Sequence, residues 1–380
     1  MRLGLNGRFL AARATGVQRF AREVAERLCR RAEVTLLLPS GSGAHRCVAD
    51  AADVVEGRLP GKLWEQSELP LAARRAGVDV VLHLANASPR WGGPNVVVLH
   101  DVTPLTHPDA FTLPYRAWAS VAHVGAARHA AALLTVSRWA AGEIARATGV
   151  DESRIGVVRQ GVAPLDAPAS AADVDAVLAR HGLRAPYFLA VGGDPRKGLD
   201  LLYHAWGMWS SAEAPTLAVV GRVHSQVHSQ VHSQAHSQAH SRFHSQALPA
   251  GSAGAAPGSV RLLGAVPDDE LRALYTGAAG FLFPSRAEGF GRPPLEALAC
   301  GTRVAVARYG AGHEVLGDAA DVIPPTPEAW LDGARRILDE APESRAARIA
   351  AGRSHAATYS WDEAVDTILA TCQRVAKRSS

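Results

Sequence analysis

The sequence predicts an α/β protein with two doubly wound, Rossmann-like halves. Short apolar runs rich in β-branched residues alternate with longer helical stretches rich in alanine and leucine. The alternation occurs twice, before and after a proline-containing break over residues 162–185. Repeated strand–helix alternation is typical of a parallel sheet with helices on both faces. A chain of 380 residues, 47% hydrophobic, also has the length of about two domains.

Both halves are expected to follow the same plan. The strands expected in the first half are residues 2–6, 34–40, 78–84, 95–101, 132–137 and 154–161, with a helix over 16–31. The strands expected in the second half are residues 187–193, 216–221, 259–265, 280–285 and 303–307. Ligands of doubly wound sheets bind outside the carboxyl ends of the strands, so the loops after these strands are where chemistry is expected.

The charge distribution narrows the classes of partner. Residues 1–170 hold 20 basic and 15 acidic residues, a net charge of +5, and the remainder holds 20 and 21, a net charge of −1. A basic first half suits phosphate, nucleic acid or an anionic membrane surface, with an ordinary arginine-rich composition as the alternative. No basic cluster is interleaved with aromatic residues, which argues against nucleic acid.

Cysteine usage and hydropathy exclude further classes. The four cysteines are scattered and predict neither a disulfide scaffold nor a zinc cluster. The N-terminal residues lack the apolar core of a signal peptide. No run of 18 or more apolar residues predicts a transmembrane helix. A reduced, cytoplasmic location is therefore expected.

Residues 223–246 form six tandem four-residue units built on His-Ser and hold six of the sixteen histidines. Histidines four residues apart on a helix can bind metal, which gives the alternative of a metal-storage or sensing module. A low-complexity insertion in a surface connection is the favoured interpretation, since lengthening a loop costs little.

The segment richest in candidate site residues is residues 281–306. An expected strand leads into Ser-Arg-Ala-Glu-Gly-Phe-Gly-Arg and then into a helix expected to start at Pro293–Pro294. Gly289 and Gly291 allow the backbone to approach a ligand closely, and helix-start amides favour anions. Glu288 in the loop and Glu296, expected in the first helical turn, can accept hydrogen bonds from sugar hydroxyls. Compensation of the helix dipole is the alternative role for Glu296.

Residues 191–200 carry Arg196 and Lys197 between an expected strand and the next helix. Two cations beside helix amides suit a diphosphate that gains negative charge as a bond to it breaks. A solvated basic pair at a turn is the alternative.

Two segments of the first half also carry candidate site residues. Thr15 and Gln18 have the spacing of a capping box, which predicts a helix start at Gly16. His100 and Asp101 end the strand expected over 95–101, and a structural role for this histidine is the alternative to a catalytic one. Ser137 is expected to cap the next helix.

The segment Pro-Ser-Arg-Ala-Glu-Gly-Phe-Gly-Arg-Pro-Pro-Leu-Glu-Ala-Leu-Ala-Cys-Gly, residues 284–301, resembles the E-x7-E segment of the retaining glycosyltransferases of family 4, which have the GT-B fold. The resemblance covers nearly the whole chain apart from the histidine repeat. By this resemblance Glu288 contacts the donor sugar hydroxyls and Glu296 the ribose hydroxyls. The amides of the Gly289, Phe290 and Gly291 loop lie near the diphosphate.

The same resemblance assigns the other segments. It places Arg196 and Lys197 on the diphosphate, the Gly16 loop against the donor phosphates and His100 near the donor sugar. The glycine loop departs from the family pattern, because its second glycine is Gln18 here.

The resemblance also implies a domain plan. An N-terminal acceptor domain is expected over 1–164, a linker over 165–185 and a nucleotide-sugar donor domain over 186–355, with the repeat at 223–246 as an insertion. A helix and tail over 356–380 cross back to the first domain. The two domains face a central cleft.

The function implied is transfer of a hexose or deoxyhexose from a nucleotide diphosphate sugar to a glycan or lipid-linked acceptor in cell-surface polysaccharide synthesis. GDP-mannose is the donor that the segment style favours. No metal is expected, because fixed cations take its place. A nucleotide-sugar 2-epimerase of related fold and a non-catalytic scaffold of an assembly complex are the alternatives.

Peripheral contact with the inner membrane surface is a further expectation. It would involve the basic helix ends at Arg27, Arg30 and Arg31 and at Arg74 and Arg75. Solvated helix C-termini are the alternative.

Overall fold

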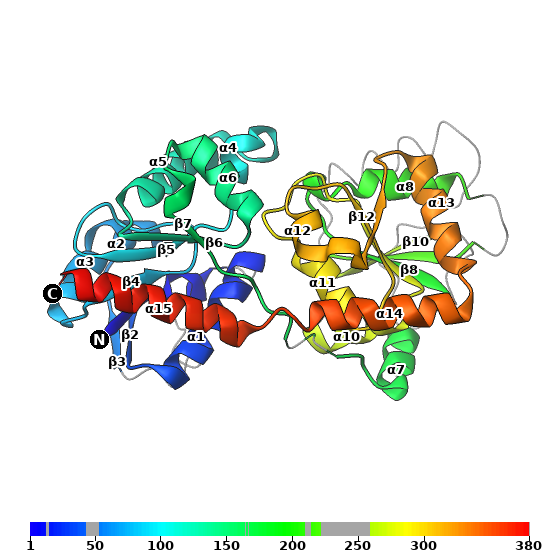
Figure 1. Ribbon diagram of the computed structural model, residues 1–380, viewed down its shortest axis with the longest axis horizontal. Helices are drawn as coiled ribbons and strands as arrows, with labels where there is room; N and C mark the ends of the chain where they lie inside the picture. The colour runs from blue at the N-terminus through cyan, green and yellow to red at the C-terminus, as the bar shows by residue number, and fades with distance from the viewer. Residues whose placement is uncertain are drawn as a thin grey trace. The chain divides into compact units, whose positions relative to one another are not determined.

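The computed structural model describes residues 1–12, 15–42, 53–163, 165, 167–209, 214–221 and 259–379. The histidine repeat at 223–246 lies outside the described residues. The chain forms two compact units (Figure 1): unit 1 combines Met1–Gly161 with the segment from Tyr359 onward, and unit 2 is Val162–Thr358.

Unit 1 is built on a seven-stranded sheet in the order β3-β2-β1-β4-β5-β6-β7, with every neighbouring pair parallel. Its strands are β1 (Leu3–Asn6), β2 (Val34–Leu38), β3 (Asp53–Glu56), β4 (Val80–His83), β5 (Asn95–Val98), β6 (Ala132–Thr135) and β7 (Ile155–Val157). Its helices are α1 (Gly16–Arg31), α2 (Gly61–Ser67), α3 (Leu69–Arg75), α4 (Thr103–Thr106), α5 (Leu113–His129), α6 (Arg138–Thr148) and α15 (Trp361–Ser379), with 3-10 turns η1 (Gly7–Ala11), η2 (Pro108–Ala110) and η3 (Glu152–Arg154).

Unit 2 repeats the plan with a six-stranded parallel sheet in the order β10-β9-β8-β11-β12-β13. Its strands are β8 (Tyr187–Val191), β9 (Thr216–Val220), β10 (Val260–Gly264), β11 (Gly280–Phe283), β12 (Val304–Ala307) and β13 (Asp321–Ile323). Its helices are α7 (Ala171–His181), α8 (Leu199–Gly207), α10 (Asp268–Gly277), α11 (Arg292–Ala299), α12 (Gly312–Leu316), α13 (Pro327–Leu338) and α14 (Pro342–Ala356), with 3-10 turns η4 (Pro195–Lys197) and η5 (Gly317–Ala319).

The central strands are buried on both faces, as parallel sheets between helices require. Every residue of β1, β2, β4 and β5 is buried, and the same holds for β9, β11 and β12. Two of the four edge strands, β3 and β13, were not predicted, because they are short and only partly buried and so lack a continuous apolar run. The doubly wound α/β fold is confirmed.

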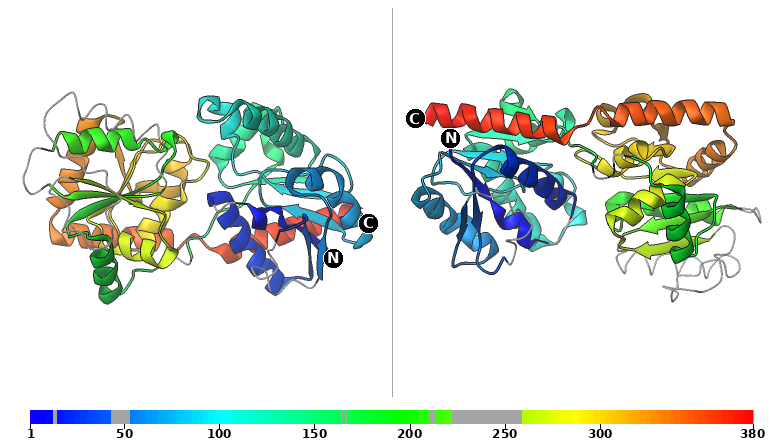
Figure 2. Two further views of the ribbon diagram at one scale, coloured as in Figure 1. Left: turned by 180° about the vertical axis from the view of Figure 1, so that it is seen from behind. Right: turned by 90° about the horizontal axis from the view of Figure 1, so that it is seen from below.

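The last helix of the chain and the segment expected as a linker each belong to one of the two units. Helix α15 belongs to unit 1, where it packs against α1 and β4 (Figure 2), so the expected return of the chain end is confirmed. The segment expected as a linker over 165–185 contributes α7 to unit 2, where it packs against α10. The division between the units falls after Gly161 and again after Thr358.

Each sheet has one topological switch point, where the chain leaves two neighbouring strands in opposite directions. In unit 1 it lies between β1 and β4, and in unit 2 between β8 and β11. Crevices outside the carboxyl ends of strands at such points are the usual ligand sites of open α/β sheets. The residues that follow these four strands are therefore the candidates for function.

Candidate functional site

The switch point of unit 2 brings together the two segments that the sequence singled out in that half. The loop after β8 leads into η4, and Asp194 caps this turn by accepting from the Arg196 amide at 2.9 Å. Gly198 follows at φ +65°, and a Cβ there would lie 2.2 Å from the Pro284 carbonyl oxygen after β11. The two loops touch so closely that only glycine fits between them.

The central contact is an ion pair between Lys197 and Glu288. The Lys197 ammonium donates to Glu288 Oε1 at 2.5 Å, and the Ser285 hydroxyl donates to the same oxygen at 2.6 Å. Both charged side chains are partly exposed, at 23% and 18%. Glu288 Oε2 makes no hydrogen bond with any described residue. The site therefore offers a fixed ammonium beside a carboxylate with accepting capacity to spare.

Arg196 is held by Asp194, a partner that the sequence analysis missed. The guanidinium donates from Nε to Asp194 Oδ1 at 3.0 Å and from a terminal nitrogen to Oδ2 at 2.9 Å. Burial acts to raise the pKa of Asp194, but the hydrogen bonds from Arg196 and the nearby cations hold it below its usual value. The expected direct phosphate contact therefore starts from a guanidinium that is already oriented.

Arg286 ties the two loops together and was also missed. Its amide donates to the Arg196 carbonyl at 2.8 Å, and its guanidinium donates to the Pro195 carbonyl at 3.1 Å and to Asp200 at 2.6 Å. The only indication of this role in the sequence was a basic residue directly before Ala287-Glu288. Its contacts join the loop after β11 to η4 and the start of α8.

Helix α11 begins one residue earlier than expected, at Arg292, so Glu296 lies in its second turn rather than its first. Gly291 precedes the helix at φ +86°, where a Cβ would lie 2.2 Å from the Tyr309 hydroxyl. Gly289 and Phe290 complete the loop between Glu288 and this cap, with the Phe290 ring buried.

Glu296 is 3% exposed, and both carboxylate oxygens already have partners. Arg292 Nε lies 2.8 Å from Oε1, and the Tyr275 hydroxyl lies 3.4 Å from Oε2. The sequence analysis expected a first-turn carboxylate and did not predict the burial or these two partners.

In unit 1, helix α1 begins at Gly16 as predicted, with Thr15 as its N-cap. The capping-box bonds are replaced: the Thr15 hydroxyl donates to Gln18 Oε1, and the cap makes no side-chain bond to the backbone. A Cβ on Gly16 would meet nothing within 4 Å among the described residues. No contact within unit 1 therefore explains a glycine here, which leaves room for a ligand to approach.

His100 is buried and held in one orientation. Its Nε2 lies 3.0 Å from the Leu84 carbonyl, to which it donates, and the ring packs edge-on against Phe20 of α1 at 4.7 Å. Burial lowers the pKa of His100, so the ring is neutral at pH 7. Asp101 Oδ1 accepts from the Thr103 amide at 2.9 Å at the start of α4.

The structure also bears on the predicted cap at Ser137 and on the arginines expected near lipid. Ser137 caps α6 by accepting from the Ala140 amide, as predicted. Arg27 is paired with Glu23 at 2.6 Å and Arg31 with Asp366, so two of the arginines expected near lipid are engaged within unit 1. Among the described residues no helix is long and apolar enough to cross a membrane, and no cluster of three potential metal ligands occurs.

Family models match both halves of the chain. A model described as glycosyl transferases group 1 matches residues 181–355, and a model described as glycosyltransferase family 4 matches residues 14–164.

Curated relatives match in part. O-antigen chain mannosyltransferase B of Escherichia coli is 37% identical over 111 residues, which are 29% of this chain and 29% of that protein. O-antigen chain mannosyltransferase RfbU of Salmonella typhimurium is 26% identical over 268 residues, which are 70% of this chain and 65% of that protein. The chain therefore spans less than two thirds of the length of either relative.

Solved structures match over nearly the full length. Sucrose-phosphate synthase from Thermosynechococcus elongatus has a TM-score of 0.74 at 16% identity, with 98% of each chain covered. HepE of Anabaena, in complex with UDP and glucose, has a TM-score of 0.69 at 17% identity, with 97% of this chain and 98% of that chain covered. At these identities the likeness shows a shared fold.

Proposed function

Because this chain belongs to the glycosyltransferases of group 1 and family 4 and has their GT-B fold, we propose that it is a retaining hexosyltransferase. It moves a sugar from a nucleotide diphosphate sugar to a glycan or lipid-linked acceptor in cell-surface polysaccharide synthesis. The observation that carries this proposal is the Lys197–Glu288 pair at the switch point of unit 2, with one carboxylate oxygen left for a ligand.

The chemistry follows from the charges at this site. The bond between the anomeric carbon and the diphosphate breaks, and its electron pair leaves with the diphosphate. Lys197 and the oriented Arg196 stabilise that growing negative charge, which is the largest single contribution expected of such a site. The acceptor hydroxyl bonds to the anomeric carbon, and its proton passes to an oxygen of the departing diphosphate. Glu288 Oε2 accepts from a sugar hydroxyl and orients the ring.

Two residues of unit 1 support the same reaction. The open space beside Gly16 allows the donor phosphates to approach the first amides of α1, where the helix dipole favours anions. A neutral His100 whose Nε2 donates to Leu84 keeps Nδ1 as an acceptor for a donor-sugar hydroxyl. Glu296 is assigned to the ribose hydroxyls of the nucleotide through the acceptor positions that Arg292 and Tyr275 leave, since each carboxylate oxygen can accept two hydrogen bonds.

The proposed donor is inferred from the relatives, and the proposed independence from metal is inferred from Lys197 and Arg196. The relatives named as O-antigen mannosyltransferases favour GDP-mannose as donor. Because Lys197 and Arg196 supply the positive charge, the reaction is proposed to need no metal. A cytoplasmic site of action fits a nucleotide-sugar donor, with peripheral contact at the inner face of the membrane through the basic ends of α1 and α3.

The test is donor binding followed by product analysis. Thermal shifts with GDP-, UDP- and dTDP-sugars, each with and without EDTA, identify the nucleotide, since a ligand that binds only the folded state raises the melting temperature. The expected result is a shift with GDP-mannose that survives EDTA. Transfer to a mannose-terminated acceptor is then followed by NMR of the new anomeric proton, and an α-mannoside from an α-linked donor establishes retention.

Three results would overturn parts of the proposal. Conversion of the donor to its 2-epimer without acceptor would make the protein an epimerase. Absence of any shift, with an intact melting transition, would make it a scaffold. A shift that disappears in EDTA would contradict the metal-free site.

A further inference from the structure

The switch point of unit 1 holds a polar cluster that the proposed reaction does not use. Asn6 at the end of β1 donates to Glu65 Oε1 at 2.7 Å and lies 3.0 Å from His83 Nδ1 at the end of β4. Arg8, just after β1, donates from Nε to the same Glu65 oxygen at 2.9 Å. Glu65 is 1% exposed, and its Oε2 has no partner among the described residues. This is where an open α/β sheet binds its ligand.

Lys62 extends this cluster to the surface. It lies three residues before Glu65, on the same side of α2. Its ammonium sits 3.5 Å from the centre of the Trp118 ring and 5.8 Å from that of Tyr115. It forms no ion pair with a described carboxylate, although its side chain is exposed.

The positive charges of Lys62 and Arg8 are therefore close enough to repel each other. Burial, and then the charge of Arg8, lower the pKa of Lys62, and the nearby Glu65 offsets only part of this. Arg8 uses only Nε of its side chain on Glu65, so its terminal nitrogens have no partner among the described residues. An ammonium without an ion-pair partner, near a guanidinium whose terminal nitrogens lack partners among the described residues, favours the binding of an anion.

An aromatic ledge, formed by Phe111, Tyr115 and Trp118, borders Lys62. Phe111 stacks on Tyr115 at 5.4 Å, Tyr115 contacts Trp118 at 5.6 Å, and Trp118 contacts His123 at 6.1 Å. Two large apolar side chains close in sequence to Lys62 and Phe111 are exposed, at 68% for Leu63 and 73% for Leu113. Rings and apolar side chains next to fixed donors are the usual lining of a site for a ligand with apolar and charged parts.

We propose that Lys62, on the ledge of Trp118 and Tyr115, and the nearby Arg8 bind a phosphate group carried by the acceptor. The inference rests on the proposed transferase function and names its second substrate as a phosphorylated acceptor. The Trp118 ring fixes the ammonium by a cation–π contact and leaves N–H donors for phosphate oxygens. The phosphate is either that of a polyprenyl lipid carrier or that of a soluble phosphorylated sugar.

The composition of the chain makes this site unusually easy to test. The sequence has only three lysines, Lys62, Lys197 and Lys377. They fall at the proposed acceptor site, at the donor site and in the last turn of α15. An amine-acetylating reagent at pH 8, read out by peptide mass spectrometry, therefore reports on both sites and carries Lys377 as an internal control.

The probes are inorganic phosphate, mannose 6-phosphate, a short-chain polyprenyl phosphate in non-ionic micelles, and neutral methyl α-mannoside. We expect at least one phosphate probe to slow labelling of Lys62 about five-fold at about four times its Kd, with Lys377 unchanged. Protection by mannose 6-phosphate identifies a soluble acceptor, and protection by the polyprenyl phosphate alone identifies a lipid carrier. Protection by no phosphate probe, or equal protection by the neutral mannoside, would overturn the inference.

Variants check the same point by calorimetry with the phosphate probe that protects. Lys62→Met should weaken its binding at least ten-fold, roughly the loss of one charge-assisted hydrogen bond, while Lys62→Arg should stay within about three-fold. Trp118→Leu should weaken it about three-fold through loss of the cation–π contact. Wild-type phosphate affinity in Lys62→Met would contradict the site.

Donor binding separates the two proposals. GDP-mannose should protect Lys197 in the wild type and in Lys62→Met alike. Protection of Lys197 without protection of Lys62 would leave the transferase proposal intact and remove the acceptor site. Protection of Lys62 by phosphate with no donor effect at Lys197 would leave a phosphate site and remove the transferase.

Discussion

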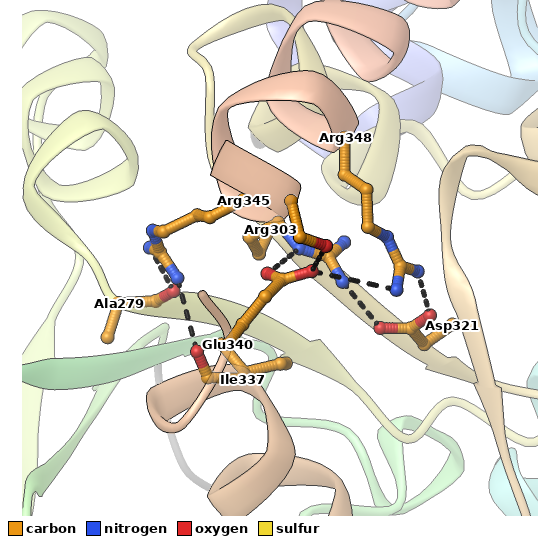
Figure 3. Close-up of polar contacts among 8 residues, drawn as sticks. Ala279, Arg303, Asp321, Ile337, Glu340, Arg345 and Arg348 are labelled. Atoms are coloured by element: carbon orange, nitrogen blue, oxygen red, sulfur yellow. Dashed lines mark hydrogen bonds and ion pairs between the residues drawn. The ribbon is translucent and has the colours of Figure 1, made fainter. Parts of the chain in front are cut away.

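Unit 2 carries a cluster of charged residues at each end of its sheet, and the two clusters differ in how completely their carboxylates are satisfied. At the amino end, Arg303 is 3% exposed and donates to Glu340 Oε2 at 2.7 Å and to Asp321 Oδ2 at 2.9 Å (Figure 3). Arg348 reaches the remaining oxygen of each carboxylate. At the carboxyl end, Glu288 has one oxygen with two donors and one with none.

The difference indicates two roles for the same residue types. Arg345 completes the amino-end cluster by donating to the Ala279 and Ile337 carbonyls at 2.7 and 3.3 Å, which anchors α14 to the sheet (Figure 3). Every carboxylate oxygen there has a cationic partner, which favours a role in packing. A buried, saturated network specifies packing, whereas a partly exposed and unsaturated pair is available to substrate.

The largest effect on the rate of sugar transfer is expected from a substitution at the carboxyl end of the unit 2 sheet. Lys197→Ala should lower the rate of sugar transfer by about 10²–10³-fold, because one stabiliser of the leaving diphosphate is lost. The melting temperature should change little, since the pair is partly exposed. Initial rates and thermal melts measure the two, with Lys377→Ala as the matched control. Wild-type transfer by Lys197→Ala would place catalysis elsewhere.

The amino-end cluster should show the opposite pattern. Arg303→Met should lower the free energy of unfolding by about 3 kcal/mol, because Glu340, 9% exposed, and Asp321, 30% exposed, lose their main partner. Donor affinity of the folded protein should not change. Urea denaturation and donor titration at low temperature test this, with Arg348→Ala, 43% exposed, expected to cost at most about 1 kcal/mol. Loss of donor affinity in Arg303→Met would mean that the ends are not independent.

The polar cluster of unit 1 extends the comparison to a network that is buried yet incomplete. Burial lowers the pKa of His83 from 6.5 to about 4, so the folded protein keeps it neutral while the unfolded chain protonates below pH 6.5. Its contribution to stability is therefore full above pH 6.5 and is lost as pH falls towards 4, by up to about 1.4 kcal/mol per pH unit.

His83→Gln should reduce this slope, measured as the free energy of unfolding between pH 4.5 and 7. The exposed His107→Gln is the control. An unchanged slope in His83→Gln would assign the acid sensitivity to other groups, such as His123, whose pKa burial also lowers to about 4.

The smallest effect is expected at Gly16, where a substitution tests whether a ligand or the fold requires the glycine. Gly16→Ala should raise stability by about 0.4–1 kcal/mol, because the added methyl group meets open space and the unfolded chain loses freedom. Its KM for donor should rise several-fold if phosphates approach there. Gly142→Ala in α6 is the control, because its Cβ would make only ordinary contacts. An unchanged KM in Gly16→Ala would remove the glycine from the donor site.

Much of the fold was predictable because parallel strands are buried on both faces and read as continuous apolar runs. The edge strands β3 and β13 were not, since exposure on one side removes that pattern. The segments of the donor site were predictable because cations, glycines and carboxylates stood directly after strands. Asp194 and Arg286 were missed, because their roles depend on which loop lies beside which.

The sequence by itself determined which residues end strands and helices, since local apolar periodicity, glycines and caps set those points. It therefore placed Lys197, Glu288 and Gly16 at strand or helix ends. Only the tertiary structure decided which of them meet: that Lys197 bonds to Glu288, that Glu296 is buried under Arg292, and that Lys62 rests on Trp118. Contacts between residues distant in the chain depend on the strand order of the sheets, and one sequence without its fold does not specify that order.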